Sequence, residues 1–261
     1  MNGVNKTLYI PLYGKSLISK QGIILKDPEA ERIWEEEGFP IRGKSKSKWL
    51  AYNMAMRARV FDDWTDSMLH KAPDALVLHI GCGLDSRYLR IKNTYREWID
   101  CDLEEVIAVR KKYFKQTDRY HMAALDASDS RQIRSLPDSN TVTVILEGIS
   151  MYLTVGQLRR LFRALEKKYQ TLHILLDAYT VFGARASKYR NPVNDVGVTM
   201  LHGINDINRV IDGLRIRFVR EHTFTPPSLV NKMKPAERAI FKLLFTGRIY
   251  RKIYRLYELE A

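Results

Sequence analysis

The chain has 261 residues, of which 45% are hydrophobic and 28% are charged, and its formal net charge is +13. This composition supports a sizeable core and excludes wholesale disorder. No apolar run reaches the roughly 18 residues of a membrane-spanning helix, and the N-terminus lacks the apolar stretch of a secretory signal. The two cysteines, Cys82 and Cys101, lack the CxxC spacing of zinc sites. We therefore expect a cytoplasmic protein without a metal site.

The basic excess is concentrated near the C-terminus. Between residues 232 and 257 there are eight lysines and arginines and a single acid, Glu237. Nucleic acid, an anionic membrane or an acidic substrate would each complement such a charge.

The first 70 residues predict helices. Asp27 can cap a helix that has Pro28 at its first position and acids in its first turn. We expect that helix to end near Gly38. A second helix is expected over residues 49–70, where apolar residues recur near helical spacing.

From Ala75 onward, short apolar runs alternate with amphipathic stretches. Such strand–helix units predict an α/β fold: a doubly wound, mostly parallel, Rossmann-like sheet with helices on both faces. The expected strands are residues 75–80, 97–101, 121–125, 142–146, 172–178 and 215–223. The expected helices are residues 87–91, 104–114, 155–169 and 204–213.

The expected organisation is a single domain over residues 1–261. Residues 1–70 form an N-terminal helical cap, and residues 71–231 form the core. A long loop inserted after the fifth strand, about residues 179–203, is predicted to act as a lid. Residues 232–261 are predicted to form a basic helix from Pro235 to about Glu258. This helix either docks on the domain with a solvated basic face, or contacts an anionic membrane, nucleic acid or acidic carrier protein.

The first strand leads into a glycine turn. Gly81 and Gly83 would allow a tight turn and let a ligand approach backbone amides. A GxG by itself is equally typical of a simple turn. The second strand ends in Asp100 and Asp102, about 20 residues later, where an acid can accept hydrogen bonds from a ribose diol. One of these acids is also suited to cap the following helix.

The next two strands also end in polar residues. Asp126-Ala127 follows the third strand and has a carboxylate and an amide that suit an adenine edge. Glu147-Gly148 follows the fourth strand. Because ligands of open α/β sheets bind outside the carboxyl ends of the strands, this ordered series predicts one shared binding crevice.

Together these motifs resemble the leucine carboxyl methyltransferase family, in the branch of tetracenomycin-type polyketide O-methyltransferases. The resemblance covers most of residues 8 to 178. Its most specific elements are Gly81-Cys82-Gly83-Leu84-Asp85-Ser86-Arg87 and Glu147-Gly148-Ile149-Ser150-Met151-Tyr152-Leu153. The segments that share it also include residues 8–15, 27–30, 56–63 and 99–106.

The resemblance implies a class I methyltransferase with S-adenosylmethionine as cofactor. It places Arg57 and Lys15 at the methionine carboxylate and Glu147 near the methionine amino group. It also places Gly81 beside the methionine, Asp102 at the ribose, and Asp126 with Ala127 at the adenine. The predicted cofactor-binding residues are Lys15, Arg57, Gly81, Gly83, Asp85, Asp100, Asp102, Asp126, Ala127 and Glu147. One departure is His79, which stands where many class I methyltransferases have an acid.

The catalytic candidates are Tyr152, near the donor methyl group, and Tyr179 and His202, in or near the lid. A carboxylate acceptor would need no general base, whereas a phenol or hydroxyl would benefit from one. The sequence thus predicts an O-methyltransferase of a small-molecule carboxylate, hydroxyl or phenol. Two alternatives remain open: an RNA- or polyanion-binding protein or methyltransferase that uses the basic C-terminal helix, and a non-catalytic fold.

Overall fold

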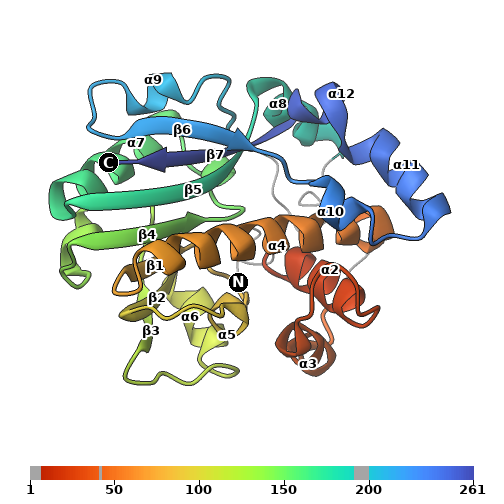
Figure 1. Cartoon of the computed structure of the whole chain (residues 1–261), viewed down its shortest axis with the longest axis horizontal. Coiled ribbons are helices and arrows are strands. Elements are labelled where there is room, and N and C mark those ends of the chain that lie inside the picture. The colour runs from red at the N-terminus through yellow and green to blue at the C-terminus, as the bar shows by residue number, and fades with distance from the viewer. Residues whose placement is uncertain (1–6, 41–42, 191–199) are drawn as a thin grey trace.

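A seven-stranded sheet of order β3-β2-β1-β4-β5-β7-β6 runs through the molecule (Figure 1). The computed structural model describes residues 7–40, 43–190 and 200–261. β1 to β5 pair in parallel, whereas β7 is antiparallel to both of its neighbours, β5 and β6. The strands are β1 Leu76–Ile80, β2 Glu97–Asp102, β3 Tyr120–Ala124, β4 Thr141–Leu146, β5 Thr171–Tyr179, β6 Arg217–His222 and β7 Tyr254–Glu260.

The central strands are buried along almost their whole length because helices cover both faces of the sheet. Every residue of β1 is buried, and so are five of the six residues of β4. Such continuous burial is typical of parallel strands in α/β proteins. The doubly wound, mostly parallel sheet predicted from the sequence is thereby confirmed.

The helices form layers on either side of the sheet (Figure 1). α4 packs against β4 and β5 on one face, and α7 packs against β5, α9 and η2 on the other. Their bounds are α2 Tyr9–Ser19, α3 Pro28–Glu37, α4 Lys48–Lys71, α5 Arg87–Arg90, α6 Glu104–Arg110, α7 Val155–Lys168, α8 Val181–Arg190, α9 Asn208–Ile211, α10 Pro227–Val230, α11 Pro235–Phe245 and α12 Gly247–Arg251. The described residues also form three 3-10 turns: η1 Gly43–Lys46, η2 Ser130–Ser135 and η3 Ser150–Tyr152.

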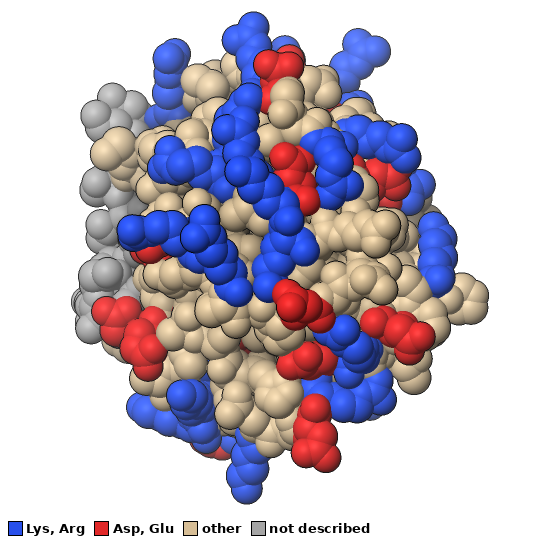
Figure 2. Space-filling view, turned by 90° about the vertical axis from the view of Figure 1, so that its left-hand side faces the viewer, with Lys and Arg blue, Asp and Glu red and all other residues tan. Residues whose placement is uncertain are grey.

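The face in Figure 2 shows how the cationic excess is distributed near α7. Lysines and arginines stand out there, but acids are interspersed among them (Figure 2). Ion pairs such as Lys168 Nζ–Asp138 Oδ1, at 2.6 Å, and Arg217 Nη2–Glu260 Oε1, at 2.8 Å, link the two signs of charge. Part of the cationic charge of this face is therefore balanced locally.

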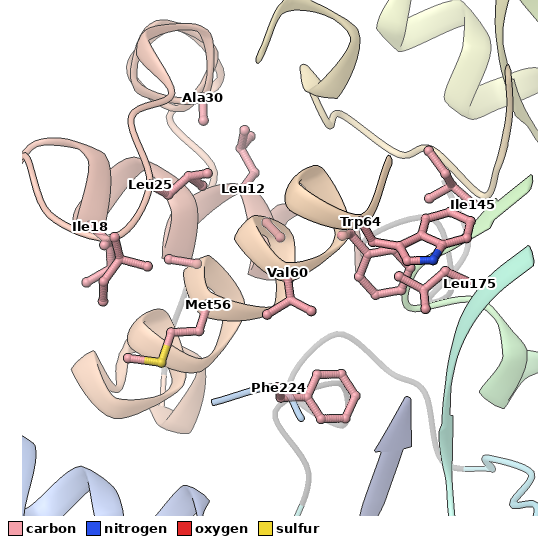
Figure 3. Close-up of a cluster of buried hydrophobic side chains, with 14 of the residues drawn as sticks. Leu12, Ile18, Leu25, Ala30, Met56, Val60, Trp64, Ile145, Leu175 and Phe224 are labelled. Atoms are coloured by element: carbon pink, nitrogen blue, oxygen red, sulfur yellow. The ribbon is translucent and has the colours of Figure 1, made fainter. Parts of the chain in front are cut away.

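The N-terminal helices share one apolar cluster with the sheet (Figure 3). The helix bounds follow the predicted signals: the Asp27 side chain accepts the Ala30 amide, and Gly38 ends α3 at φ +56°. α4 lies between α2 and the strands. The residues of this apolar cluster that are labelled in Figure 3 are Leu12, Ile18, Leu25, Ala30, Met56, Val60, Trp64, Ile145, Leu175 and Phe224.

The predicted C-terminal helix from Pro235 to Glu258 is wrong. Gly247 has a φ of +74°, in the left-handed region, and it separates α11 from α12. The chain then extends as β7 and fills the space between β5 and β6. The sequence Tyr254–Glu260 suits this position because its tyrosines and leucines are buried between two hydrogen-bonding neighbours. Tyr250 and Tyr254 are four residues apart, a spacing that by itself favours a helix.

Several predicted boundaries also change. The expected lid loop begins with a helix, α8, and residues 191–199 lie outside the described residues. The helix expected over residues 204–213 is limited to Asn208–Ile211, and the one expected to reach Phe114 ends at Arg110. Within the described ranges, no helix combines the length and apolarity needed to cross a bilayer.

Candidate functional site

A cavity of about 870 Å³ lies at the carboxyl ends of β1, β2 and β4. Residues of the N-terminal cap and of the C-terminal segment form the rest of its wall. It is lined by eleven of the predicted site residues: Lys15, Arg57, Gly81, Gly83, Asp85, Asp102, Asp126, Ala127, Glu147, Tyr152 and Tyr179. The other two, Asp100 and His202, are not among its lining residues.

The turn after β1 requires glycine at its first position. Gly81 has a φ of +76°, and an added Cβ would lie 2.6 Å from Cδ1 of Ile149. Its amide donates to the carbonyl of Cys101 at 2.7 Å, which holds the turn against the end of β2. Any side chain at residue 81 would therefore strain the backbone and displace Ile149.

Asp102 presents a fixed carboxylate to this cavity. The Gly83 amide donates to its Oδ2 at 2.8 Å, and the Leu103 amide donates to its Oδ1 at 2.8 Å. Burial raises the pKa of Asp102, while the two amide hydrogen bonds oppose that increase. The carboxylate is thus pre-oriented to accept hydrogen bonds from ligand hydroxyls.

Asp100 lies two residues earlier on β2 and is enclosed by protein, so the structure does not support its predicted cofactor contact. Its Oδ2 accepts hydrogen bonds from Arg110 Nη2 and from the Tyr120 hydroxyl, the latter at 2.8 Å. Arg110 also donates to the Gly83 carbonyl at 3.0 Å. His79 Nδ1 lies 3.2 Å from Asp100 Oδ1. Asp100 therefore supports the glycine turn through Arg110 instead of lining the cavity.

Arg57 connects the N-terminal cap to two strand ends. Its Nε donates to Glu147 Oε1 at 2.9 Å, and its Nη1 donates to the Tyr254 hydroxyl at 3.1 Å. Tyr254 in turn donates to Asp177 Oδ2 at 2.7 Å. The Gly148 amide donates to the other oxygen of Asp177, also at 2.7 Å. Burial raises the pKa of Asp177 to about 6, against the opposing effect of Arg57.

Asp177 and Tyr254 both contact Arg57, but neither is among the site residues predicted from the sequence. Asp177 lies two residues before the end of the apolar strand β5, and Glu147 directly follows β4, so an acid near the end of an apolar run is a usable signal. Tyr254 had no such signal because it was assigned to a helix. It belongs to β7, and pairing of β7 with β5 brings it opposite Tyr179.

A second group of buried charges surrounds Asp85. Lys15 Nζ lies 3.0 Å from Asp85 Oδ2, and Arg90 Nη1 lies 2.9 Å from Oδ1. Burial opposes ionisation of Asp85, but these cations and Arg87 hold its pKa well below the usual range. Arg87 also pairs with Glu147, so the two charged groups are continuous.

The two charged groups together contain more carboxylates than cations. The cations are Lys15, Arg57, Arg87 and Arg90, and the carboxylates are Asp27, Asp62, Asp85, Glu147 and Asp177. With all five acids ionised, these nine residues have a net charge of −1. A buried group with this imbalance favours a ligand that has one net positive charge.

The Asp126 turn lies at another part of the cavity. Asp126 Oδ1 accepts the Ser128 amide at 2.8 Å, and the Asp126 amide donates to Gln132 Oε1 at 2.9 Å. Leu103 and Leu125 line the cavity beside it. This combination of a fixed polar turn and apolar walls suits the edge and faces of a purine.

The remaining lining residues are mostly apolar and come from α2, α4, η3, β5, α8, the C-terminal segment and the loops between them. Tyr152 and Tyr179 belong to this part, and the Tyr179 ring centroid lies 4.6 Å from that of Tyr254. Other large members include Leu50, Met54, Met151, Leu201, Leu244, Phe245, Tyr250 and Ile253.

His202 contributes its backbone near the cavity. Its amide donates to the Met151 carbonyl at 2.8 Å, which ties the segment around His202 to η3. Because its side chain does not line the cavity, the structure does not support the predicted catalytic role. Of the described residues, His79 is the one histidine in the lining.

Comparison with known proteins agrees with this arrangement. The family model described as leucine carboxyl methyltransferase matches residues 5–166, more than half of the chain. TcmP, the tetracenomycin polyketide synthesis O-methyltransferase of Streptomyces glaucescens, is 28% identical over 96% of this chain and 97% of its own length. The S-adenosyl-L-methionine-dependent methyltransferase dpfgK of Gibberella zeae is 27% identical over 65% of this chain and 63% of its own length.

Solved structures show the same fold at low sequence identity. Magnesium protoporphyrin IX methyltransferase from Synechocystis, with bound SAH, has a TM-score of 0.54 and 10% identity. The alignment covers 95% of this chain and 99% of that one. Its structure with bound SAM has a TM-score of 0.51 at 12% identity, over 91% of this chain and 98% of that one.

The sheet order, the glycine turn and the fixed acid at the end of β2 define a class I S-adenosylmethionine-dependent methyltransferase. Within that class, the chain belongs to the leucine carboxyl methyltransferase family. The enzyme class, the O-methyltransferase type and the cofactor predicted from the sequence are thereby confirmed.

Proposed function

We propose that this enzyme methylates a carboxylate oxygen of an apolar small molecule. The observation that carries the proposal is the apolar half of the cavity, which adjoins the charged cluster and is walled by aromatic and aliphatic side chains. Such a wall recognises apolar surface and excludes water. The name of the relative TcmP, an O-methyltransferase of polyketide synthesis, supports an acceptor of this kind.

The charged half of the cavity fits S-adenosylmethionine. The glycine turn in the cavity lining, the fixed carboxylate of Asp102 and the net negative charge of the buried cluster all suit this ligand. We infer that Asp102 binds the ribose hydroxyls, while Asp126 and Ala127 contact the adenine. Lys15 and Arg57 would bind the methionine carboxylate.

The Glu147 carboxylate would accept hydrogen bonds from the ammonium group of the same ligand. Gly83 and Asp85 would lie beside the bound ligand. When bound, the cofactor supplies a methyl group on a positively charged sulfur, the electrophile of the reaction. The protein contributes binding, alignment and exclusion of water.

Tyr152 acts in this proposal as a hydrogen-bond donor. Burial raises its pKa to about 12, so the hydroxyl stays protonated at neutral pH and does not serve as a base. A donor can orient an acceptor oxygen that is already ionised. This favours a carboxylate over a phenol, because a phenol would first have to lose its proton.

The test is a methyl-transfer assay with apolar carboxylic acids, matched phenols and matched primary alcohols. We expect turnover with the carboxylic acids and no turnover when each acid is replaced by its amide. A preference for phenols with no activity on acids would contradict the choice of acceptor. The RNA and polyanion alternative receives no support from the family or the named relatives.

A further inference from the structure

The side of α11 that faces solvent is apolar. Leu243 is 80% exposed and Ile240 is 47% exposed. Ala236 and Ala239 are exposed on the same side of the helix. The opposite side holds Phe241, which is fully buried. A helix with apolar residues on both its inner and its outer side has an unpartnered apolar surface.

The charges beside this surface are cationic. Lys232, Lys234, Lys242 and Arg248 are exposed on or next to α11. The helix contains one acid, Glu237, which points inward, where its carboxylate accepts hydrogen bonds from Tyr52 at 2.7 Å and Lys48 at 3.1 Å. This arrangement differs from the face in Figure 2, where acids are interspersed with the cations.

The same helix reaches the cavity. Leu244 and Phe245, at its C-terminal end, line the apolar half. α11 lies at the far end of the molecule from the β6 and α7 side (Figure 1). The apolar surface of α11 is therefore continuous, through Leu244, with the wall of the cavity.

We propose that α11 docks this enzyme on an anionic lipid bilayer. Ile240 and Leu243 enter the boundary between headgroups and acyl chains, and Lys234, Lys242 and Arg248 contact lipid phosphates. This combination of an outward apolar stripe and flanking cations is the pattern of interfacial helices. A second copy of the chain fits less well, because two-fold pairing of this face would bring its cations together. Docking here also places the cavity beside lipid, from which an apolar acceptor can enter.

The test is flotation of the full-length chain with two kinds of vesicle: phosphatidylcholine alone, and phosphatidylcholine mixed with phosphatidylglycerol. We expect binding to the mixed vesicles that weakens with added salt, and little binding to phosphatidylcholine alone. The double variant Ile240→Ser/Leu243→Ser should lower the bound fraction about tenfold. The double variant Lys234→Gln/Lys242→Gln should remove the preference for phosphatidylglycerol.

The matched control is Leu89→Ser, which removes an apolar side chain that is 54% exposed on α5 and should leave binding unchanged. Retained S-adenosylhomocysteine binding in each variant shows that it is folded. Equal binding to both vesicle types, no vesicle binding, or wild-type binding by Ile240→Ser/Leu243→Ser would overturn the proposal. A dimer in sedimentation velocity that dissociates in this variant would also overturn it, by assigning the face to a second copy.

Discussion

Asp100 and Asp102 show how strongly the role of a carboxylate depends on its position along a strand. Asp102 stands at the mouth of the crevice, with its oxygens held by the Gly83 and Leu103 amides. Asp100 lies deeper and neutralises Arg110. The two acids should therefore respond differently to the same substitution.

We expect Asp102→Asn to weaken S-adenosylhomocysteine binding about tenfold or more, because one charge-assisted acceptor is lost. Its melting temperature should stay close to that of the wild type. Asp100→Asn should instead destabilise the fold by about 3–5 kcal/mol, because Arg110 is left buried without its countercharge. Calorimetric titration and chemical denaturation measure the two effects. The assignment fails if Asp100→Asn impairs only binding and Asp102→Asn impairs only stability.

Asp177 predicts a pH dependence of cofactor binding. Burial raises its pKa to about 6, so the carboxyl is ionised above this pH and neutral below it. Its ionised form contributes the negative charge that favours a cationic sulfonium. Binding of S-adenosylmethionine should therefore weaken as the pH falls from about 7 to about 5, by up to about tenfold. Binding of S-adenosylhomocysteine, which lacks the sulfonium charge, should change less over the same pH range.

The variant Asp177→Asn provides the control for this pH effect. Its residue 177 cannot ionise, so the difference in binding affinity between the two ligands should no longer change near pH 6. If Asp177→Asn keeps the full pH dependence, another titrating group causes the effect. Calorimetry at several pH values for both ligands distinguishes these outcomes.

At the scale of elements, β7 shows how a C-terminal segment becomes part of the core and of the site. It pairs with β5 and β6, and its first residue, Tyr254, bridges Arg57 and Asp177. Leu256 in its middle is fully buried. The segment therefore contributes both stability and a wall of the cavity.

We expect Leu256→Ala to lower the free energy of unfolding by about 2–5 kcal/mol, because it leaves a cavity between the sheet and α4. Lys252→Ala, at an exposed position just before the strand, should change it by less than about 0.5 kcal/mol. Urea denaturation of both variants provides the comparison. Similar effects of the two substitutions would argue against a buried β7.

At the scale of the whole molecule, the cavity is closed by segments distant in sequence. The lining includes Lys15 from α2, Arg57 from α4, the strand ends of the core, and Tyr254 from β7. A ligand that contacts all of them binds the assembled structure in preference to the unfolded chain. It should therefore stabilise the cap, the core and the C-terminal segment together.

S-adenosylhomocysteine at about one hundred times its Kd should raise the free energy of unfolding by about 2.7 kcal/mol. Hydrogen exchange should slow in α2, in the Gly81–Asp85 turn and at the start of β7. The Asp102→Asn variant should need a higher ligand concentration for the same protection. Protection confined to the core strands would show that the cap and β7 do not contribute to the site.

Much of the fold could be predicted from the sequence because its signals are local. The Asp27 cap, the Pro28 start and the Gly38 end determine α3 within a few residues. Alternating apolar runs and amphipathic stretches identify β1 to β6 and the parallel sheet. Glycines and acids at successive strand ends indicate the crevice, because parallel topology brings those ends to one edge.

Other features were decided only by the tertiary structure. Helical spacing of tyrosines and cations in the C-terminal segment indicated one basic helix, but the open edge of β5 made a strand more favourable. The separation of Asp100 from Asp102 depends on Arg110 and Tyr120, which enclose one carboxylate and leave the other at the cavity. The outward apolar side of α11 depends on which of its two apolar sides packs against the domain. In each case, the periodicity of residues along the chain restricts the choices, and burial against partners distant in sequence selects among them.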